Sequence, residues 1–255
     1  MNPHLPAEAP PIFVVSLERA GDRKAFVHRV FHEAGLEYEI VPAVDAKALG
    51  AAELATYSSR RAVFEYGREL SRGVLACSLS HLRVLQRIID EGLEAAVVFE
   101  DDTRPLPGFG DLLTAPKLVP DDCDVLTFHS LYDWASATPV SEEPVFGDFR
   151  LCRYGRTPMG TQAYLITRRG AERVLDVAFP VSLPSDEILF RPRPAALEVY
   201  GVEPSPVAQE DFPSEIDVPA PPLRDHSQLT RVALQLLGIS GRAWQRVERL
   251  RRPTR

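Results

Sequence analysis

The sequence of 255 residues has only three cysteines, Cys77, Cys123 and Cys152, and they stand far apart in the chain. Their number is odd and no CxxC pair is present, which argues against a disulfide framework and against a zinc site. Such cysteine usage fits a reducing compartment. No run of about 18 continuous apolar residues occurs, so we expect no transmembrane helix.

A secretory signal and an excess of positive charge are also missing. Residues 1–11 have no basic region followed by an apolar core, so we expect a flexible leader on a cytoplasmic protein. The 36 acidic residues outnumber the 29 basic ones, and this balance argues against general nucleic-acid binding. The composition, 45% hydrophobic and 25% charged, is ordinary for a globular protein. We predict one domain at 12–225 and a basic tail at 226–255.

The first elements predict a strand, a helix and a second strand. Residues 12–17 are apolar and β-branched, as in a buried parallel strand. A helix is expected next, capped by Asp22 and ended by Gly35. Its apolar residues recur with the spacing of one helical face: Val27, Val30, Phe31 and Ala34. Residues 38–43 then complete a right-handed βαβ unit with adjacent strands.

The rest of the chain continues this alternation. Irregular helical turns are expected at 47–70 and a strong helix at 73–92. Further strands are predicted at three places: 95–99, 124–129 and 161–167. We interpret 131–160 as loops and short strands, expect a helix at 168–178, and assign little beyond 190. The alternation predicts an α/β fold with an open, mostly parallel sheet of Rossmann type, flanked by helices.

Three acidic residues follow one of the buried strands. Glu100, Asp101 and Asp102 come directly after the apolar run 95–99. Because alternate side chains of an extended segment point to one side, Glu100 and Asp102 can face the same ligand. Their oxygens suit Mg²⁺ or Mn²⁺ bridging to phosphate. The alternative is a solvated acidic turn, but the buried strand directly before the acids favours the metal.

Other polar residues are expected at the same edge of the sheet, where open α/β folds bind ligands. The segment from Ser16 to Arg23 follows the first strand, and Asp45 follows the second. Arg19 and Arg23 lie near a helix start, which suits a phosphate or a pyrimidine carbonyl. The alternative is a pair of ordinary solvated arginines.

Two further segments offer candidate site residues. Ser80 and His81 are not a hydrolase pair, because neighbours on a helix point apart and no GxSxG elbow is present. The alternative for His81 is a histidine at the helix surface. Asp186 and Glu187 follow a proline turn, and either could act as a general base. Alternatively, Ser185 or Asp186 caps a helix there.

Seven segments together form an ordered set that spans roughly residues 12–216. They are VVSLERAGDR, YEIVPAVDA, ACSLSHLRVLQRII, AAVVFEDD, GTQAYLITRRGAERVL, LPSDEIL and PVAQEDFPSEI. This set resembles glycosyltransferase family 25, the bacterial lipopolysaccharide and animal collagen galactosyltransferases. Each segment is modest, but their order is specific.

The resemblance implies a GT-A-like fold and an inverting transfer from a UDP-sugar, most commonly UDP-galactose, to a hydroxyl. The acceptor would be a saccharide or a lipid-linked saccharide in the synthesis of lipopolysaccharide or another surface glycan. Mn²⁺ or Mg²⁺ would be bound by Glu100 and Asp102, and Asp186 is the candidate base. The implied nucleotide-sugar contacts are Ser16, Leu17, Arg19, Arg23, Asp45, Ser80, His81 and Asp101.

Four positions depart from the family's usual pattern. Ala46 and Ala76 stand where the family has glycine, and Gln162 stands where histidine is frequent. Glu215 replaces the aspartate of a late Ser-Asp-Ile. These changes bear on the donor sugar more than on activity.

The tail carries the strongest charge signal in the chain. Residues 226–255 hold seven arginines and one glutamate, a charge of +6 that leaves −13 for the remainder. Apolar residues, Trp244 among them, fall on one helical face. This pattern is typical of a peripheral helix on an anionic membrane surface, here the inner face of the cytoplasmic membrane. The alternative is a helix docked on the chain's own acidic domain.

Two other functions are compatible with the same residues. A Mg²⁺-dependent phosphohydrolase or nucleotidyltransferase would use the same acids, but it leaves the segment GTQAY unexplained. A catalytically degenerate module would hold a nucleotide-sugar or a partner, and it would not need Asp186.

Overall fold

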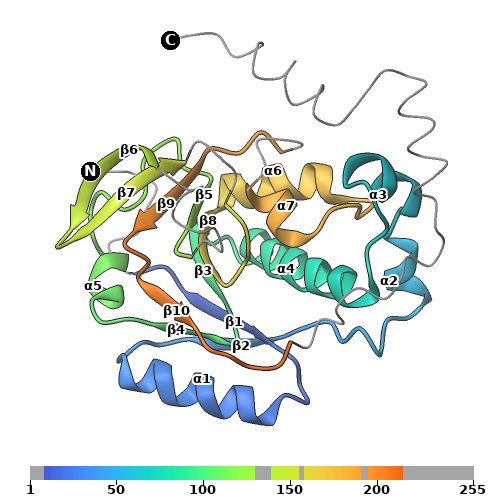
Figure 1. Ribbon diagram of the computed structural model, residues 1–255, viewed down its shortest axis with the longest axis horizontal. Helices are drawn as coiled ribbons and strands as arrows, with labels where there is room; N and C mark the ends of the chain where they lie inside the picture. Colours follow the sequence, from blue (N-terminus) through green and yellow to red (C-terminus); the bar gives the residue numbers. More distant parts are fainter. Residues whose placement is uncertain (1–8, 130–138, 155–157, 191–194, 215–255) are drawn as a thin grey trace, which may run out of the picture.

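The computed structural model describes residues 9–129, 139–154, 158–190 and 195–214. The predicted tail at 226–255 and most of the leader lie outside these residues. The described chain forms a mixed eight-stranded sheet with helices on both faces, together with a two-stranded ribbon (Figure 1). No helix among the described residues is both long and apolar enough to cross a bilayer.

The large sheet has the strand order β2-β1-β3-β8-β5-β9-β7-β6, and β10 pairs with β4 in the ribbon. The strands are β1 (Ile12–Ser16), β2 (Glu39–Pro42), β3 (Ala95–Glu100), β4 (Thr103–Pro105), β5 (Val125–Thr127), β6 (Pro139–Phe146), β7 (Phe149–Tyr154), β8 (Ala163–Thr167), β9 (Val199–Glu203) and β10 (Val207–Gln209). The helices are α1 (Gly21–Glu33), α2 (Ala51–Ala55), α3 (Ser59–Glu65), α4 (Arg72–Asp90), α5 (Phe109–Leu113), α6 (Arg168–Ala178) and α7 (Ser185–Phe190).

The direction of the strands confirms the predicted fold class. Strand β1 runs parallel to β2 and β3, and β5 runs parallel to β9. Strand β8 is antiparallel to both of its neighbours, β3 and β5, and β7 is antiparallel to β9 and β6. Only β7 and β8 therefore oppose the other six strands, so the sheet is mostly parallel in strand direction, although four of its seven neighbouring pairs are antiparallel.

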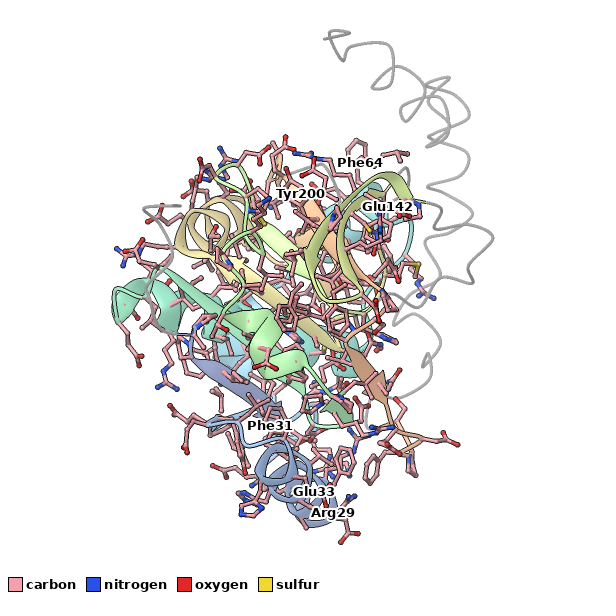
Figure 2. The ribbon with its side chains drawn as sticks, turned by 90° about the vertical axis from the view of Figure 1, so that its left-hand side faces the viewer. Arg29, Phe31, Glu33, Phe64, Glu142 and Tyr200 are labelled. Atoms are coloured by element: carbon pink, nitrogen blue, oxygen red, sulfur yellow. The ribbon has the colours of Figure 1, made fainter. Side chains whose placement is uncertain are left out.

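Alternation along the strands divides the core into two layers. Phe13 and Val15 pack into the cluster formed with α4, α6 and α7, whereas Ile12 and Val14 pack into the cluster formed with α1 and α5. In Figure 2, Phe31 points from α1 toward the sheet while Arg29 and Glu33 on the same helix point outward. Phe31 is fully buried and meets Phe99 of β3 edge to face, with ring centroids 5.1 Å apart.

The strong helical pattern at 73–92 is confirmed by α4. The Ser71 side chain accepts a hydrogen bond from the Val74 backbone N–H and caps the helix, and Gly92 follows its end with φ +68°. Leu75, Leu79 and Leu82 are all buried against the sheet. Burying each leucine contributes about 1.5–3 kcal/mol, so this face holds α4 in place against the sheet.

Some details of the prediction are wrong. Asp22 does not cap α1, because the helix begins after Ala20 and Asp22 lies within its first turn. Its carboxylate there interacts favourably with the helix dipole. Ala34 is exposed at the end of the helix, and Phe26 fills the buried place instead. The expected end at Gly35 is confirmed, with φ +65°.

The later part of the chain is more ordered than the sequence indicates. The segment interpreted as loops contains a hairpin of β6 and β7, which turns at Gly147. Beyond residue 190, β9 lies inside the sheet between β5 and β7. In the same part of the chain, β10 pairs with β4, and β4 is the strand that directly follows the acidic residues.

Candidate functional site

The polar residues gather where β1, β2 and β3 end. Because β8 runs antiparallel to β3, the residues that precede β8 also reach this edge. The Glu100 backbone N–H donates to the Gln162 carbonyl oxygen at 2.8 Å, and the Thr161 hydroxyl donates to Glu100 Oε1 at 2.5 Å. The edge is thus built from the carboxyl ends of three strands and the amino end of a fourth.

The middle acid of the acidic motif is held by two other predicted site residues. Asp101 accepts from the Ser16 hydroxyl at 2.7 Å and from Arg23 Nη1 at 2.5 Å. Asp101 is only 7% exposed, and the Arg23 side chain only 11%. The alternatives of a solvated acidic turn and a solvated arginine are therefore wrong for these residues.

Asp102 is also buried but less well neutralised. Arg23 Nη1 lies 3.5 Å from Asp102 Oδ2, and Gln209 Nε2 donates to the same oxygen at 3.4 Å. Burial, helped by the negative charge of Glu100, raises the pKa of Asp102 above its ordinary value. Asp101 and Asp102 thus share one close guanidinium, Glu100 stands beside them, and the donor set suits a hard divalent cation.

A segment from the end of the described chain covers these acids. The Glu210 backbone N–H donates to the Asp102 carbonyl oxygen at 2.7 Å, and Arg23 Nη2 donates to the Pro213 carbonyl oxygen at 2.9 Å. Phe212 receives the Arg23 guanidinium over its ring, 5.2 Å from the centroid. We call residues 207–213 the strap.

Glu100 belongs to a second chain of contacts. His81 Nε2 lies 3.5 Å from Glu100 Oε1, and His81 Nδ1 lies 2.9 Å from the Tyr164 hydroxyl. Burial lowers the pKa of His81, but Tyr164, Cys77 and Glu100 outweigh it and raise this pKa well above its ordinary value. Burial raises the pKa of Glu100, but the contact with His81 outweighs it and lowers this pKa. His81 is only 2% exposed, so the alternative of a surface histidine is wrong.

Ser80 ties α4 to the loop that follows β2. Its hydroxyl accepts from the Val44 backbone N–H at 2.8 Å and donates to the Ala76 carbonyl oxygen at 2.7 Å. The next residue in that loop, Asp45, accepts from the Lys47 backbone N–H at 2.9 Å and from Arg19 Nε at 2.9 Å, and both hydrogen bonds lower its pKa. Ser80 therefore supports the loop that places Asp45.

Leu17 and Asp186 border the same edge. Leu17 is half-buried after β1, in a turn that its carbonyl oxygen closes by accepting from the Ala20 backbone N–H at 3.0 Å. Asp186 lies in the first turn of α7 and accepts from the backbone N–H groups of Glu187, at 2.9 Å, and Gly160, at 3.3 Å. The carboxylate of Asp186 is thereby held beside the residues that precede β8.

Comparison with known proteins settles the family. The sequence model of glycosyltransferase family 25, described as LPS biosynthesis protein, matches residues 9–189. The chain belongs to glycosyltransferase family 25. The family segment therefore contains all eleven residues predicted for the site, from Ser16 to Asp186.

Two curated relatives show what kinds of protein the family contains. Procollagen galactosyltransferase 2 of Mus musculus is 32% identical over 189 residues, which cover 70% of this chain and 29% of the relative. A probable inactive glycosyltransferase 25 family member 3 of Bos taurus is 29% identical over 190 residues, which cover 70% and 31%. The chain thus spans less than a third of the length of these relatives.

A solved structure gives a weaker likeness. It is a glycosyltransferase involved in the glycosylation of the major capsid of PBCV-1. The match covers 66% of each chain, with 11% sequence identity and a TM-score of 0.31.

Several residues at this edge of the sheet are not predicted as site residues from the sequence. Thr161 and Gln209 contact Glu100 and Asp102, and Tyr164 contacts His81. The segments that contain them, GTQAY and PVAQEDF, are part of the family resemblance, but their place in the fold is not readable from their pattern. His129, after β5, also lies in the field of Glu100, and its buried Nδ1 has no hydrogen-bond partner within the described part of the chain.

Replacement of Arg23 by glutamine should destabilise the fold by about 3 kcal/mol, because two buried carboxylates lose their cation. Urea unfolding followed by circular dichroism measures this change. Arg29→Gln is the matched control on the same helix, since its ion pair with Glu33 is exposed, and it should change stability by less than about 0.5 kcal/mol. Equal effects of the two substitutions would contradict the role of Arg23.

Proposed function

We propose that the protein is an inverting glycosyltransferase that moves a sugar from a UDP-sugar to a hydroxyl of a saccharide acceptor, and that this sugar is galactose. The observation that supports this function best is the group of three carboxylates at the end of β3, of which Asp101 and Asp102 are buried, inside the segment that the family matches. A site for a cation and a diphosphate accounts for this burial of negative charge.

Glu100 and Asp102 would hold Mn²⁺ or Mg²⁺. The fit rests on the oxygen donors and on the raised pKa of Asp102, which reflects burial first and then the negative charge of Glu100, neither of which Arg23 fully offsets. When bound, such a cation offsets the charge that develops on the leaving diphosphate. Asp101 accepts hydrogen bonds from Ser16 and Arg23, and it would thereby keep the turn between the two ligand residues in place.

The nucleotide would lie along the ends of β1 and β2. Arg19 is the more exposed of the two predicted arginines, with 39% of its side chain accessible, and it is paired with Asp45. A guanidinium in this place can exchange its carboxylate partner for a phosphate or a pyrimidine carbonyl. Ser80 would act indirectly, through the loop that carries Asp45.

Asp186 would act as the general base. Its carboxylate is half-buried and held by two backbone N–H groups, so it has a fixed place near Thr161 at the edge of the site. The acceptor hydroxyl would attack the sugar carbon from the face opposite the diphosphate, and Asp186 would take its proton. The bond between the sugar and the phosphate breaks, and UDP leaves.

A nucleotide-sugar-binding module without catalysis is the second candidate. The specific observation in its favour is the relative named as probably inactive, which matches this chain over nearly the same share as the galactosyltransferase does. Both candidates require the nucleotide site, and only the transferase requires a base.

The first test is the melting temperature with UDP-sugars, with and without Mn²⁺. We expect stabilisation that needs both ligands and approaches about 2.7 kcal/mol at a hundred times the Kd. Asp102→Asn should remove this response, whereas Asp111→Asn, at an exposed position on α5, should keep it. Absence of any metal-dependent response in the wild type would contradict both candidate functions.

The second test separates the candidates. Asp186→Asn should retain binding of UDP and Mn²⁺ but lower the rate of sugar transfer by about 10² to 10⁴, because the acceptor proton has no base. Asp176→Asn, at an exposed position on α6, is the control and should transfer normally. Binding without transfer by the wild type, for every UDP-sugar tried, favours the non-catalytic module. Release of free phosphate would instead indicate a phosphohydrolase.

The acceptor would be part of lipopolysaccharide or another surface glycan, made at the inner face of the cytoplasmic membrane. The basic tail at 226–255 would bring the enzyme there, since its arginines are attracted to anionic lipid. The full chain should therefore sediment with anionic vesicles more than a chain that ends at residue 225. Equal sedimentation would exclude this role of the tail.

A further inference from the structure

Glu100 also faces a group of ligand atoms that is different in kind. Cys77, His81 and Glu100 each offer one such atom, and these atoms lie within 4.8 Å of one another. Cys77 and His81 are four residues apart on α4, so both lie on the same face of the helix. The group therefore joins one helix face to the end of β3.

The donor set differs from that of the acidic motif. A thiolate, an imidazole nitrogen and a carboxylate oxygen are the ligands that Zn²⁺ takes in proteins, whereas Mn²⁺ and Mg²⁺ prefer oxygen alone. Tetrahedral zinc places its ligand atoms about 3.3–3.7 Å apart. The separation of 3.5 Å between His81 Nε2 and Glu100 Oε1 already fits this requirement.

The outer partners of these residues also suit a metal site. Metal-binding histidines usually donate their second ring N–H to a fixed acceptor, and His81 Nδ1 lies 2.9 Å from the buried Tyr164 hydroxyl. With Nδ1 directed to Tyr164, Nε2 is left facing Glu100 and Cys77. The Thr161 hydroxyl holds the Glu100 carboxylate in turn.

Cys77 is the most accessible of the three cysteines. Cys77 is half-buried, whereas Cys123 and Cys152 are buried. The spacing of the three cysteines argues against a zinc site built from several thiolates. A single cysteine can nevertheless share a cation with a histidine and a carboxylate that the fold brings to it.

We propose that Cys77, His81 and Glu100 bind a thiophilic divalent cation of the Zn²⁺ type. Binding releases two protons to solvent, the thiol proton of Cys77 and the Nε2 proton of His81. The site shares Glu100 with the cation of the donor nucleotide, so Zn²⁺ competes with Mn²⁺ and UDP. The competition rests on the proposed function, whereas the zinc site does not.

The test is a Zn²⁺ titration of the reduced full chain against a chromophoric chelator. Wild-type protein should take up one Zn²⁺ that Cys77→Ala and His81→Gln do not take up. The double variant His28→Gln/His32→Gln should keep it, which excludes adventitious binding by the exposed histidines of α1. Unchanged zinc uptake by Cys77→Ala would overturn the proposal. Melting without metal confirms that each variant is folded.

A second readout concerns the thiol itself. Zn²⁺ should protect Cys77 from alkylation by iodoacetamide in the wild type. Peptide mass spectrometry measures the rate of this alkylation. Tyr164→Phe keeps the ring but loses the hydroxyl, and it should weaken zinc binding about tenfold or more. Alkylation of Cys77 at the same rate with and without Zn²⁺ would overturn the site.

A third experiment tests whether Zn²⁺ competes with Mn²⁺ and UDP. Zn²⁺ should raise the apparent Kd for UDP measured in Mn²⁺, and this effect should disappear in Cys77→Ala. If wild-type protein binds no UDP, the proposed function fails while the zinc titration still decides the site. If one Zn²⁺ binds and the Kd for UDP is unchanged, the sharing of Glu100 is wrong.

Discussion

The fold around the site depends on how the guanidinium of Arg23 meets the carboxylates after β3. Arg23 belongs to α1, the acids follow β3, and the Pro213 carbonyl that accepts from the same side chain lies on the strap. One buried cation thus connects three segments that are far apart in the sequence. Because charges buried in this way are costly unless paired, the interaction fixes where these segments meet.

Glu100 stands at the junction of two different environments. Toward Asp102 it adds negative charge to an oxygen-rich group, and on its other side it meets the imidazole of His81 on α4 and the hydroxyl of Thr161 before β8. The first environment suits a hard cation, and the second suits a proton or a softer cation. The carboxylate is held on its helix side, so its place does not depend on a ligand.

The sequence predicts the elements that carry strong periodicity or unbroken apolar runs, such as α4 and β3. It also predicts the acids and Arg23 as site residues, because they follow apolar strands. The direction of β8 is not predictable in this way, since an antiparallel strand inside a sheet shows the same apolar residues as a parallel one. That direction alone brings Thr161 to Glu100, so this contact is missed.

The short strands near the end of the described chain escape prediction for a different reason. Prolines interrupt the segment between β9 and β10, and β10 has only three residues, too few for a pattern. The ion pairs of the site are also not readable from the sequence. Which carboxylate forms an ion pair with Arg23 depends on the tertiary packing of α1 against the sheet.

The position of β9 means that the family segment and the folding unit are not the same. The family matches residues 9–189, yet β9 at Val199–Glu203 pairs with β5 on one side and with β7 on the other. A strand between two partners cannot be left out without opening the sheet into two pieces. The segment that the family model matches is therefore shorter than the part of this chain that keeps the described sheet in one piece.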